Sequence, residues 1–369
     1  MAITELRIWF DNSPADDERL ALIEEIRVDQ AIDMVAEAQI TVPLGRDADG
    51  DWPGVLDDAV QPLTRVRIEV QVGSGGFVPL IEGRVVAQRF ELGGGPNESQ
   101  AVIVVNDESA LMNRTDRARL FEDMAPEDIA EQVFGEYGIN AQTEASNVGA
   151  PSLERVVTQR GTDFGLLRRL ARAANMVVYV EPGADPGSTD GFFRHLLSDD
   201  DGDLPEMVLT GAERNLNRLV LELDALSPVA ATAEAVDPAD LQVLSADADA
   251  SETALLGDAP TNAVADPGTV FAAASGADQT ELDALVQATV DRGAFAYSGQ
   301  GEVSAEIYPG VLRPYRTVAV AGAGTRLSGR YLVSEVTHSI RDQGYTQNFT
   351  LRRNAYSDAS GGGLLGGIF

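Results

Sequence analysis

Two runs rich in β-branched and aromatic residues flank a short polar turn near the end of the chain, between Gly329 and Asn354. The turn is Asp342-Gln343-Gly344, and a glycine beside polar residues between two such runs is typical of a β-hairpin. The sequence therefore predicts two antiparallel strands joined by a tight turn. Their apolar and aromatic positions are Tyr331, Val333, Val336, Tyr345, Phe349 and Leu351.

The first 107 residues show the alternation of half-buried β-strands. Within residues 65–72, valine or isoleucine alternates with arginine, glutamate or glutamine, so one strand face is expected to be apolar and the other polar. Residues 73–76 are a Gly-rich turn into the next strand. Closely spaced strands joined by such turns predict an antiparallel barrel or sandwich.

The apolar period changes to that of helices in the middle of the chain. Pro126-Glu127-Asp128 places proline in a first helical turn and acids near the positive end of the helix dipole, and Gly138 supplies a C-cap. A second helix is expected from Thr162 to Asn175, because Thr162 can cap it and the apolar residues that follow share a face.

The later segments alternate between β-type and helical patterns. Residues 227–278 are rich in Ala, Asp, Thr and Pro, and we expect them to bury little. Thr280 to Asp283 fits a capping box at the start of a helix that Gly293 ends. Residues 297–353 return to strands. Further strands are expected at 191–197, 216–223, 176–180 and 316–320, with an acidic turn at 199–203.

Particular residues in two segments match a known family. The closing hairpin has a Gly-x-Tyr-x-Val start at Gly329, a Val-x-His ending at His338 and a Gly-Tyr-Thr from Gly344. The middle has Pro-Glu-Asp-Ile from Pro126 and Thr-Asp-Phe-x-x-Leu-x-x-Leu-Ala from Thr162. Together these resemble the phage tail and baseplate hub family, which includes late-control D proteins and the hub part of type VI secretion (VgrG) spikes. The resemblance covers about residues 77–355, and Pro314-Tyr315 departs from it where the family has Pro-Gly.

The resemblance implies an α+β, mainly β fold with two tail-tube-like antiparallel β-barrel domains and an α/β middle domain. The expected domains are residues 1–107 as the first tube-like barrel, 108–210 as the middle domain, 211–240 with 294–355 as the second barrel, 241–293 as an acidic, Ala-rich insertion plus helix, and 356–369 as a flexible Gly-rich C-terminal tail.

The charge balance is strongly acidic. The chain has 59 Asp and Glu against 27 basic residues, all of which are Arg, and a formal net charge of -32. Acidity without lysine is typical of proteins from salt-accumulating halophiles, because at molar salt a Debye length of about 3 Å screens like-charge repulsion. In dilute buffer the same charge is expected to destabilise the fold.

Several functional classes are disfavoured by what the sequence lacks. There is no long basic patch for DNA, so DNA is expected only as non-specific passage through a channel. The absence of Cys excludes disulfides and thiolate metal sites. We see no secretion signal and no run near the ~20 apolar residues of a membrane helix, so a soluble protein without a membrane anchor, made in the cytoplasm, is expected.

The sequence offers little for catalysis or metal binding. It has two histidines, His195 and His338, and no Gly-x-Ser-x-Gly elbow. For His338 we expect packing or an intersubunit hydrogen bond. The acidic loops at 47–51 and 199–203 lack the spacing of an EF-hand, and so many acids are present that no carboxylate pair is evidence for glycoside cleavage. We expect no enzyme, no cofactor and no catalytic or metal site.

Two groups of residues are candidates for partner binding. Arg168, Arg169 and Arg172 share a helix and either reach acids across a subunit boundary or form a solvated face with intrachain pairs. The apolar residues of the Gly-rich tail either dock into a partner, the spike or another copy of the chain, or belong to a disordered end. These tail residues are Leu364, Leu365, Ile368 and Phe369.

The family resemblance implies a structural role in a virion tail or baseplate, assembled in the host cytoplasm. A homotrimer with six barrels would form a pseudo-hexameric ring that joins a hexameric tail tube to a spike or tip protein and lines the central channel. Tape measure and baseplate wedge proteins are further expected partners. The setting is a haloarchaeal virus or, as an alternative, a contractile injection system. A halophilic carbohydrate-acting or adhesive β-protein is the alternative from another class.

Overall fold

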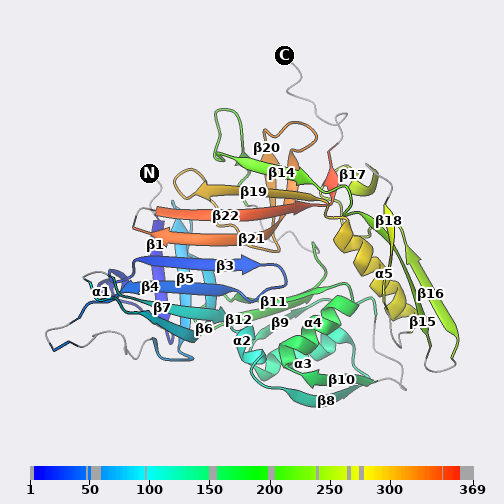
Figure 1. Cartoon of the computed structure of the whole chain (residues 1–369), viewed down its shortest axis with the longest axis horizontal. Coiled ribbons are helices and arrows are strands. Elements are labelled where there is room, and N and C mark those ends of the chain that lie inside the picture. The colour runs from blue at the N-terminus through cyan, green and yellow to red at the C-terminus, as the bar shows by residue number, and fades with distance from the viewer. Residues whose placement is uncertain are drawn as a thin grey trace.

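The computed structural model describes residues 4–46, 49–50, 60–95, 98–148, 156–197, 204–237, 241–263, 267–273, 278–342 and 344–357. Within these ranges the chain has several sheets, mostly antiparallel, and few helices (Figure 1). This confirms the predicted α+β, mainly β fold class.

The two β-rich ends of the chain form one continuous sheet, which has 13 strands within the described ranges. Its path runs β14-β19-β22-β21-β3-β4-β7-β6-β5-β1-β2, and β20, with β13 beyond it, pairs alongside β21. The strands are β1 (Thr4–Phe10), β2 (Ser13–Pro14), β3 (Glu25–Ala31), β4 (Glu37–Pro43), β5 (Arg65–Val72), β6 (Val78–Glu91), β7 (Gln100–Asp107), β13 (Met207–Val208), β14 (Leu219–Leu223), β19 (Tyr297–Ser304), β20 (Thr317–Ala321), β21 (Gly329–Arg341) and β22 (Gly344–Arg353).

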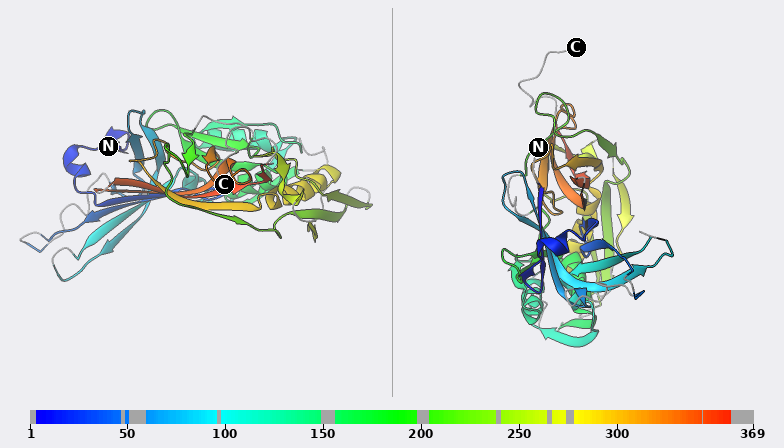
Figure 2. Two further views of the ribbon diagram at one scale, coloured as in Figure 1. Left: turned by 90° about the horizontal axis from the view of Figure 1, so that it is seen from above. Right: turned by 90° about the vertical axis from the view of Figure 1, so that its left-hand side faces the viewer.

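Each β region has its own hydrophobic core. Alternate residues of β1 and β3–β7 meet inside the first, and Ala305, Val311 and Tyr345 of the last region complete it. The second core lies among β13 and β19–β22 and includes Tyr308 and Leu312. The β6–β7 hairpin projects beyond the first core as an arm (Figure 2), and short helix α1 (Asp17–Leu20) follows β2.

The predicted hairpin and middle helices are confirmed. β21 and β22 meet at the expected turn, and Gly344 has a φ of +137° that a side chain would strain. The first middle helix begins at Pro126, and the second is capped by the Thr162 side chain, which accepts from the Gly165 amide. The middle elements are α2 (Ser109–Met112), β8 (Arg117–Glu122), α3 (Pro126–Glu136), β9 (Asn140–Thr143), β10 (Val156–Gly161), α4 (Asp163–Ala173), β11 (Val177–Pro182) and β12 (Thr189–Arg194).

The acidic region after residue 223 forms a small unit of sheet and helix. Strands β16, β15 and β18 form a three-stranded sheet that packs on α5. The elements are β15 (Val229–Val236), β16 (Val243–Ala248), β17 (Ala259–Pro260), the 3-10 turn Thr261–Ala263, β18 (Gly268–Phe271) and α5 (Gln279–Gly293), while β17 pairs with β23 (Ala355–Tyr356).

The low burial expected for residues 227–278 is wrong for this sheet. Ala231, Ala233, Ala235 and Ala246 are buried against Leu282 and its neighbours on α5. Small alanines allow helix and sheet to approach closely, so a composition that resembles a mobile linker here makes a packed layer. The expected domain boundary at residue 240 falls after β15, whereas strand pairing groups β15 with β16 and β18.

Some local expectations differ in detail from the structure. The capping box of α5 is Asp278 with Glu281, two residues earlier than expected. The predicted strand at 191–197 spans 189–194, because Leu197 adopts a positive φ of 65°, and the strand expected at 216–223 begins at 219. The acidic turn at 199–203 and most of the loop at 47–51 lie outside the described residues.

Candidate assembly site

The two β regions join edge to edge at one strand pair, β3 with β21. The first half of β21 pairs with β20, and its second half pairs with β3 from Glu335 to Arg341. The register against β22 shifts between Val333 and Glu335, where the change of partner occurs. A β-bulge bends a strand and increases its twist, so this irregularity lets one strand serve both regions.

A buried polar cluster ties the strands at this joint. His338 of β21 is fully buried, with Nδ1 2.7 Å from the Tyr345 hydroxyl and Nε2 3.1 Å from Oε1 of Gln30. The Gln30 amide donates in turn to the carbonyl of Leu80. Burial lowers the pKa of His338 to about 3, with a smaller contribution from the Arg313 guanidinium. A neutral, enclosed imidazole with both nitrogens engaged within the chain has a structural role.

A second buried cluster joins the middle domain to the first β region. Arg67 of β5 is 2% exposed, and its guanidinium contacts Glu69 and Glu82 at 2.7 Å each. It also donates to the carbonyl of Gly183, while the Gly187 amide donates to Glu82. The loop at 183–188 therefore covers the polar face of β5, and buried ion pairs with these added hydrogen bonds fix its position.

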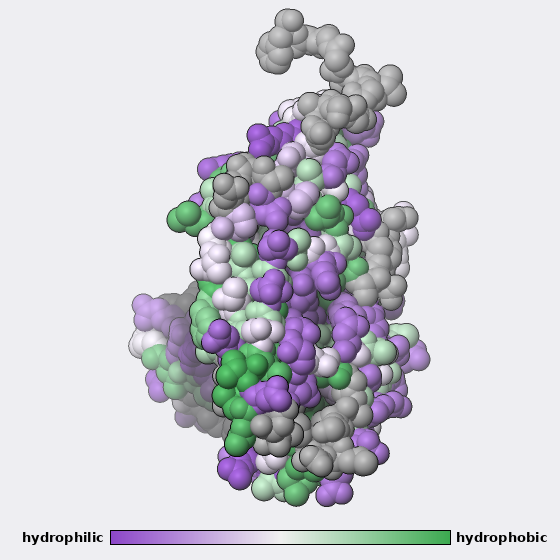
Figure 3. Space-filling model, turned by 90° about the vertical axis from the view of Figure 1, so that its right-hand side faces the viewer, coloured by the Kyte–Doolittle hydropathy of each residue, from purple (hydrophilic) through white to green (hydrophobic). Residues whose placement is uncertain are grey.

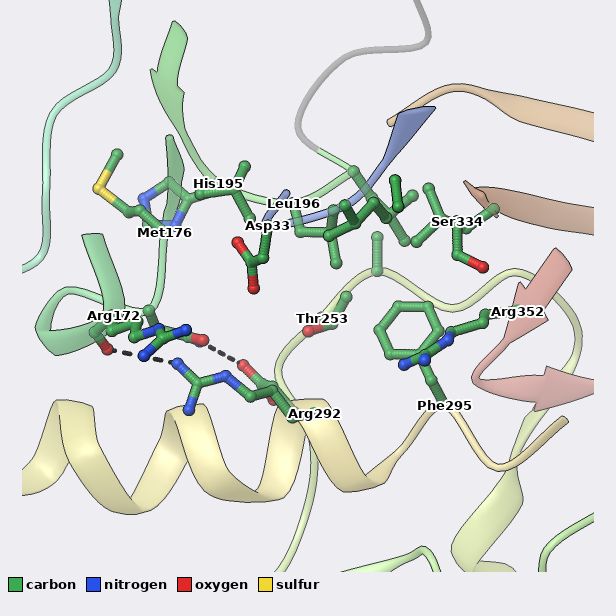
Figure 4. A pocket seen from close by; sticks show the side chains of 18 of the residues that line it. Asp33, Arg172, Met176, His195, Leu196, Thr253, Arg292, Phe295, Ser334 and Arg352 are labelled. Carbon is green, nitrogen blue, oxygen red and sulfur yellow. Dashed lines mark hydrogen bonds between the residues drawn. The ribbon is translucent and has the colours of Figure 1, made fainter. Parts of the chain in front are cut away.

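A cavity of about 680 Å³ lies where the middle domain, the acidic unit and the sheet joint meet. Arg172 and Arg292 lie near one another at one end, Phe295 and Arg352 at the other, and Asp33 points between them (Figure 4). Apolar walls come from residues including Met34, Met176 and Leu196. The carboxylate of Asp291 is already occupied by Asn175, Ser251, Gln287 and the Glu252 amide.

Polar side chains on the cavity wall are held by partners within the chain. The histidine of the wall, His195, has Nε2 3.3 Å from the carbonyl of Ala145 and its amide bonded to Glu144. Among the described residues, no cluster of three or more His, Asp or Glu side chains is arranged to hold a metal ion. The helices in the described ranges are all too short or too polar to cross a membrane.

The three arginines named as candidates for partner binding lie on α4, and each has a different environment within the chain. Arg168 is half-buried, and Arg169 donates to the carbonyl of Thr158 on β10. Arg172 lines the cavity, and its carbonyl accepts from Arg292 on α5 at 3.5 Å. The predicted tail residues Leu364, Leu365, Ile368 and Phe369 lie outside the described residues.

Sequence reasoning missed the residues that build the joints. Arg67 sits in a strand that alternates normally, and only the covering loop 183–188 buries it. Arg292 and Arg352 reach the cavity from segments far apart in sequence. A signal existed for Gln30 and His338, because each occupies an alternate position that apolar residues hold elsewhere in its strand: Gln30 follows Ile26 and Val28, and His338 follows Val336.

A family model described as the Alg8 N-terminal domain matches residues 7–342, which is well over half of the chain. The chain belongs to the Alg8 N-terminal domain family. The match runs from within β1 to the end of β21, and β22 and β23 lie beyond it. No curated protein matches the chain by sequence.

Solved structures similar to this family member include tail and secretion proteins. The 43 kDa tail protein of prophage MuSo2 from Shewanella oneidensis has a TM-score of 0.66 at 14% identity, covering 95% of this chain and 99% of that one. The tail protein from Neisseria meningitidis MC58 has a TM-score of 0.64 at 11% identity, covering 95% and 96%. The E. coli c3393 protein, a component of the type VI secretion system, has a TM-score of 0.54 at 12% identity, covering 95% and 76%. At these identities the likeness shows a shared tail-protein fold.

Proposed function

We propose that the protein is a structural hub of a tail or injection device and not an enzyme. The observation that carries this proposal is the β3–β21 pair, which joins two β regions with separate cores into one sheet. Each chain holds two such regions, so a trimer would hold six. Six wall units would match the symmetry of a sixfold tube. The shared fold with phage tail proteins and a type VI secretion component supports the same role.

In this proposal residues 1–107 form the first tube-like unit, and 211–223 with 294–355 form the second, because β14 pairs with β19 while β15 belongs to the acidic unit. Residues 108–210 are the middle domain between the two units. Three chains close a pseudo-hexameric ring that lines a channel, carries a hexameric tail tube on one side and receives a spike or tip protein on the other. The tail that follows β23, through Leu364, Leu365, Ile368 and Phe369, docks on the spike; Tyr356, expected in this tail, belongs to β23. Rings of this kind are permanent, and their interfaces bury on the order of 2,000 Å² or more.

We place this hub in a halophilic setting, as part of an archaeal virus or a related contractile injection particle. The net charge of -32 and the absence of lysine support work at high salt. The buried joints at His338 and Arg67 support a mechanical role, because they fix the three parts of the chain relative to one another.

Sedimentation and electron microscopy test the proposal. The purified 39.2 kDa chain in molar salt is expected to sediment as a trimer, or to become one when the spike is added, and to give a ring with sixfold features in class averages. Removal of residues 361–369 is expected to weaken spike binding while the trimer persists. A chain that stays monomeric with and without its spike partner, or that has hydrolytic activity, contradicts the proposal.

A further inference from the structure

Two residues beside the β3–β21 joint have a left-handed backbone, although neither is a glycine. Asp33, in the turn after β3, has a φ of +62°, and Tyr315, shortly before β20, has a φ of +65°. Crowding between Cβ and the following carbonyl oxygen disfavours this region for L-residues, most of all for a bulky one such as tyrosine. Residues strained in this way persist only where surrounding contacts hold them.

The contacts that hold these two residues also join them to each other. The amide of Asp33 donates to the hydroxyl of Tyr315 at 2.9 Å. The amide of Tyr315 donates to the carbonyl of Val333 in β21 at 3.2 Å, and the amide of Ile32 donates to the carbonyl of Ser334 at 2.9 Å. The turn after β3 and the segment before β20 are therefore fixed on the same stretch of β21.

The ring of Tyr315 packs against the middle domain. It stacks on Tyr179 of β11, with centroids 3.7 Å apart and ring planes at 6°, and Tyr179 stacks in turn on Phe192 of β12 at 4.8 Å. Val177, Tyr179 and Tyr315 form a small buried group apart from the larger cores, which we call the aromatic cluster. Alternate residues of β11 point into the middle core, so the cluster uses the other face of this strand.

We propose that Asp33 and Tyr315 form a strained clamp, which locks the middle domain onto the joint between the two β regions and can open as a unit. The closed clamp is stabilised by the ring stacking, by the hydrogen bond and by the ion pair that Arg316 makes with Glu181 of β11 at 2.8 Å. In the open clamp both backbones relax to ordinary conformations. The strain therefore offsets part of the gain from closure and narrows the free-energy gap between the two states. A narrow gap of this kind lets a packed element switch.

The aromatic cluster also supports one wall of the cavity. Ile32 and Leu196 pack against the cluster and line the cavity, and the side chain of Asp33 points into it (Figure 4). Opening of the clamp therefore changes the shape of the cavity. The clamp lies within one chain, so its test does not depend on whether three copies form a ring.

Alkylation of buried cysteines tests the clamp in the whole chain, which has no Cys of its own. Val177 of the aromatic cluster is 9% exposed, whereas Val133 of α3 and Val336 of β21 are fully buried in the middle core and the second β core. Tyr315→Gly is expected to raise the rate at which Val177→Cys reacts with iodoacetamide several-fold. The same change is expected to leave Val133→Cys and Val336→Cys protected, because the parts separate without unfolding. An unchanged rate at Val177→Cys, or an equal rise at all three positions, overturns the clamp.

Relief of strain without loss of contacts tests the other half of the proposal. Asp33→Gly keeps the amide that donates to Tyr315, so it is expected to lower the reaction rate of Val177→Cys. Leu241→Gly is the matched control, because Leu241 also has a φ of +62° but is 77% exposed beside the β15–β16 hairpin, on the side of the molecule that Figure 3 shows. It is expected to leave the rate unchanged. Tyr315→Ala is expected to react faster than Tyr315→Gly, because alanine keeps the strain. A rate in Asp33→Gly equal to or above that of its parent overturns the strained clamp.

Discussion

Nδ1 of His338 lies 2.7 Å from the hydroxyl of Tyr345, and both side chains are buried at the joint between the two β regions. Because the Gln30 amide donates to Leu80, the Gln30 oxygen accepts from Nε2–H, and the tyrosine hydroxyl therefore donates to Nδ1. Burial raises the pKa of Tyr345 well above its usual value, so this hydroxyl keeps its proton. The joint thus requires a neutral imidazole.

The first prediction follows from this neutral histidine. The pKa of His338 is about 3 in the folded chain and near 6.5 when unfolded, so below pH 6.5 only the unfolded chain binds the proton. Stability contributed by this group is present above pH 6.5 and is lost towards pH 3, by up to about 1.4 kcal/mol per pH unit. Urea unfolding of wild type and His338→Gln at pH 8 to 4 measures it. The difference between the two proteins should shrink as the pH falls, and a constant difference would contradict the assignment.

Asp107 is predicted to change the stability of the fold with pH in the opposite direction to His338. Burial raises its pKa to about 6, although the Ala36 and Ser109 amides donate to it at 2.6 and 2.9 Å. Between about pH 4 and 6 the unfolded chain loses this proton first, so stability falls as the pH rises through that range. Asp107→Asn is expected to remove this fall. Thermal unfolding of both proteins at pH 4, 5, 6 and 7 measures it, and parallel curves would show that Asp107 is ionised throughout.

Substitution of Arg67 is predicted to be among the more costly changes. Arg67→Met leaves the buried carboxylates of Glu69 and Glu82 without their cation, which costs about 3–5 kcal/mol. The exposed pair Arg27–Asp29 is the matched control, and Arg27→Met is expected to cost at most about 1 kcal/mol. Denaturant midpoints compare the two. Adding Glu69→Gln and Glu82→Gln to Arg67→Met should recover part of the loss, and no recovery would mean that packing dominates.

Substitution of Gly83 by any residue with a side chain is predicted to destabilise the fold. A Cβ at this position would lie 1.9 Å from the carbonyl oxygen of Asn106 on the neighbouring strand β7. Gly83→Ala must therefore displace backbone, at a cost on the order of 1–3 kcal/mol. Gly76→Ala is the control, because nothing lies within 4 Å of its Cβ position. Calorimetry should show a clearly lower midpoint temperature of unfolding for Gly83→Ala and an unchanged midpoint temperature for Gly76→Ala.

Salt is predicted to stabilise the folded chain. The net charge of -32 produces repulsion that acts over about 10 Å at 0.1 M salt and about 3 Å at 1 M. The unfolding midpoint should therefore rise steadily from 0.1 to 2 M KCl. Sucrose at matched osmolality is the control for excluded-solute effects. An equal rise in sucrose would show that screening is not the cause.

The sequence predicted elements whose signals are local. The β21–β22 hairpin, the start of α3 at Pro126 and the Thr162 cap of α4 each depend on residues within a few positions. The capping box of α5 was displaced by two residues because Asp278 and Thr280 both fit the motif, and backbone geometry selects the former. The alternation in β5 was visible, yet its polar face is also buried because the distant loop 183–188 covers it.

By itself, the amino-acid sequence determined the mainly β fold class, the positions of the main strands and helices, and the acidic character of the chain. Only the tertiary structure decided that the two β regions share one sheet, that Arg67 and His338 lie inside joints, and that the alanines of β15 and β16 pack on α5. The reason is physical. Strand and helix propensity depend on neighbouring residues, whereas edge pairing, burial of charge and cavity lining depend on segments that meet only after the chain has folded.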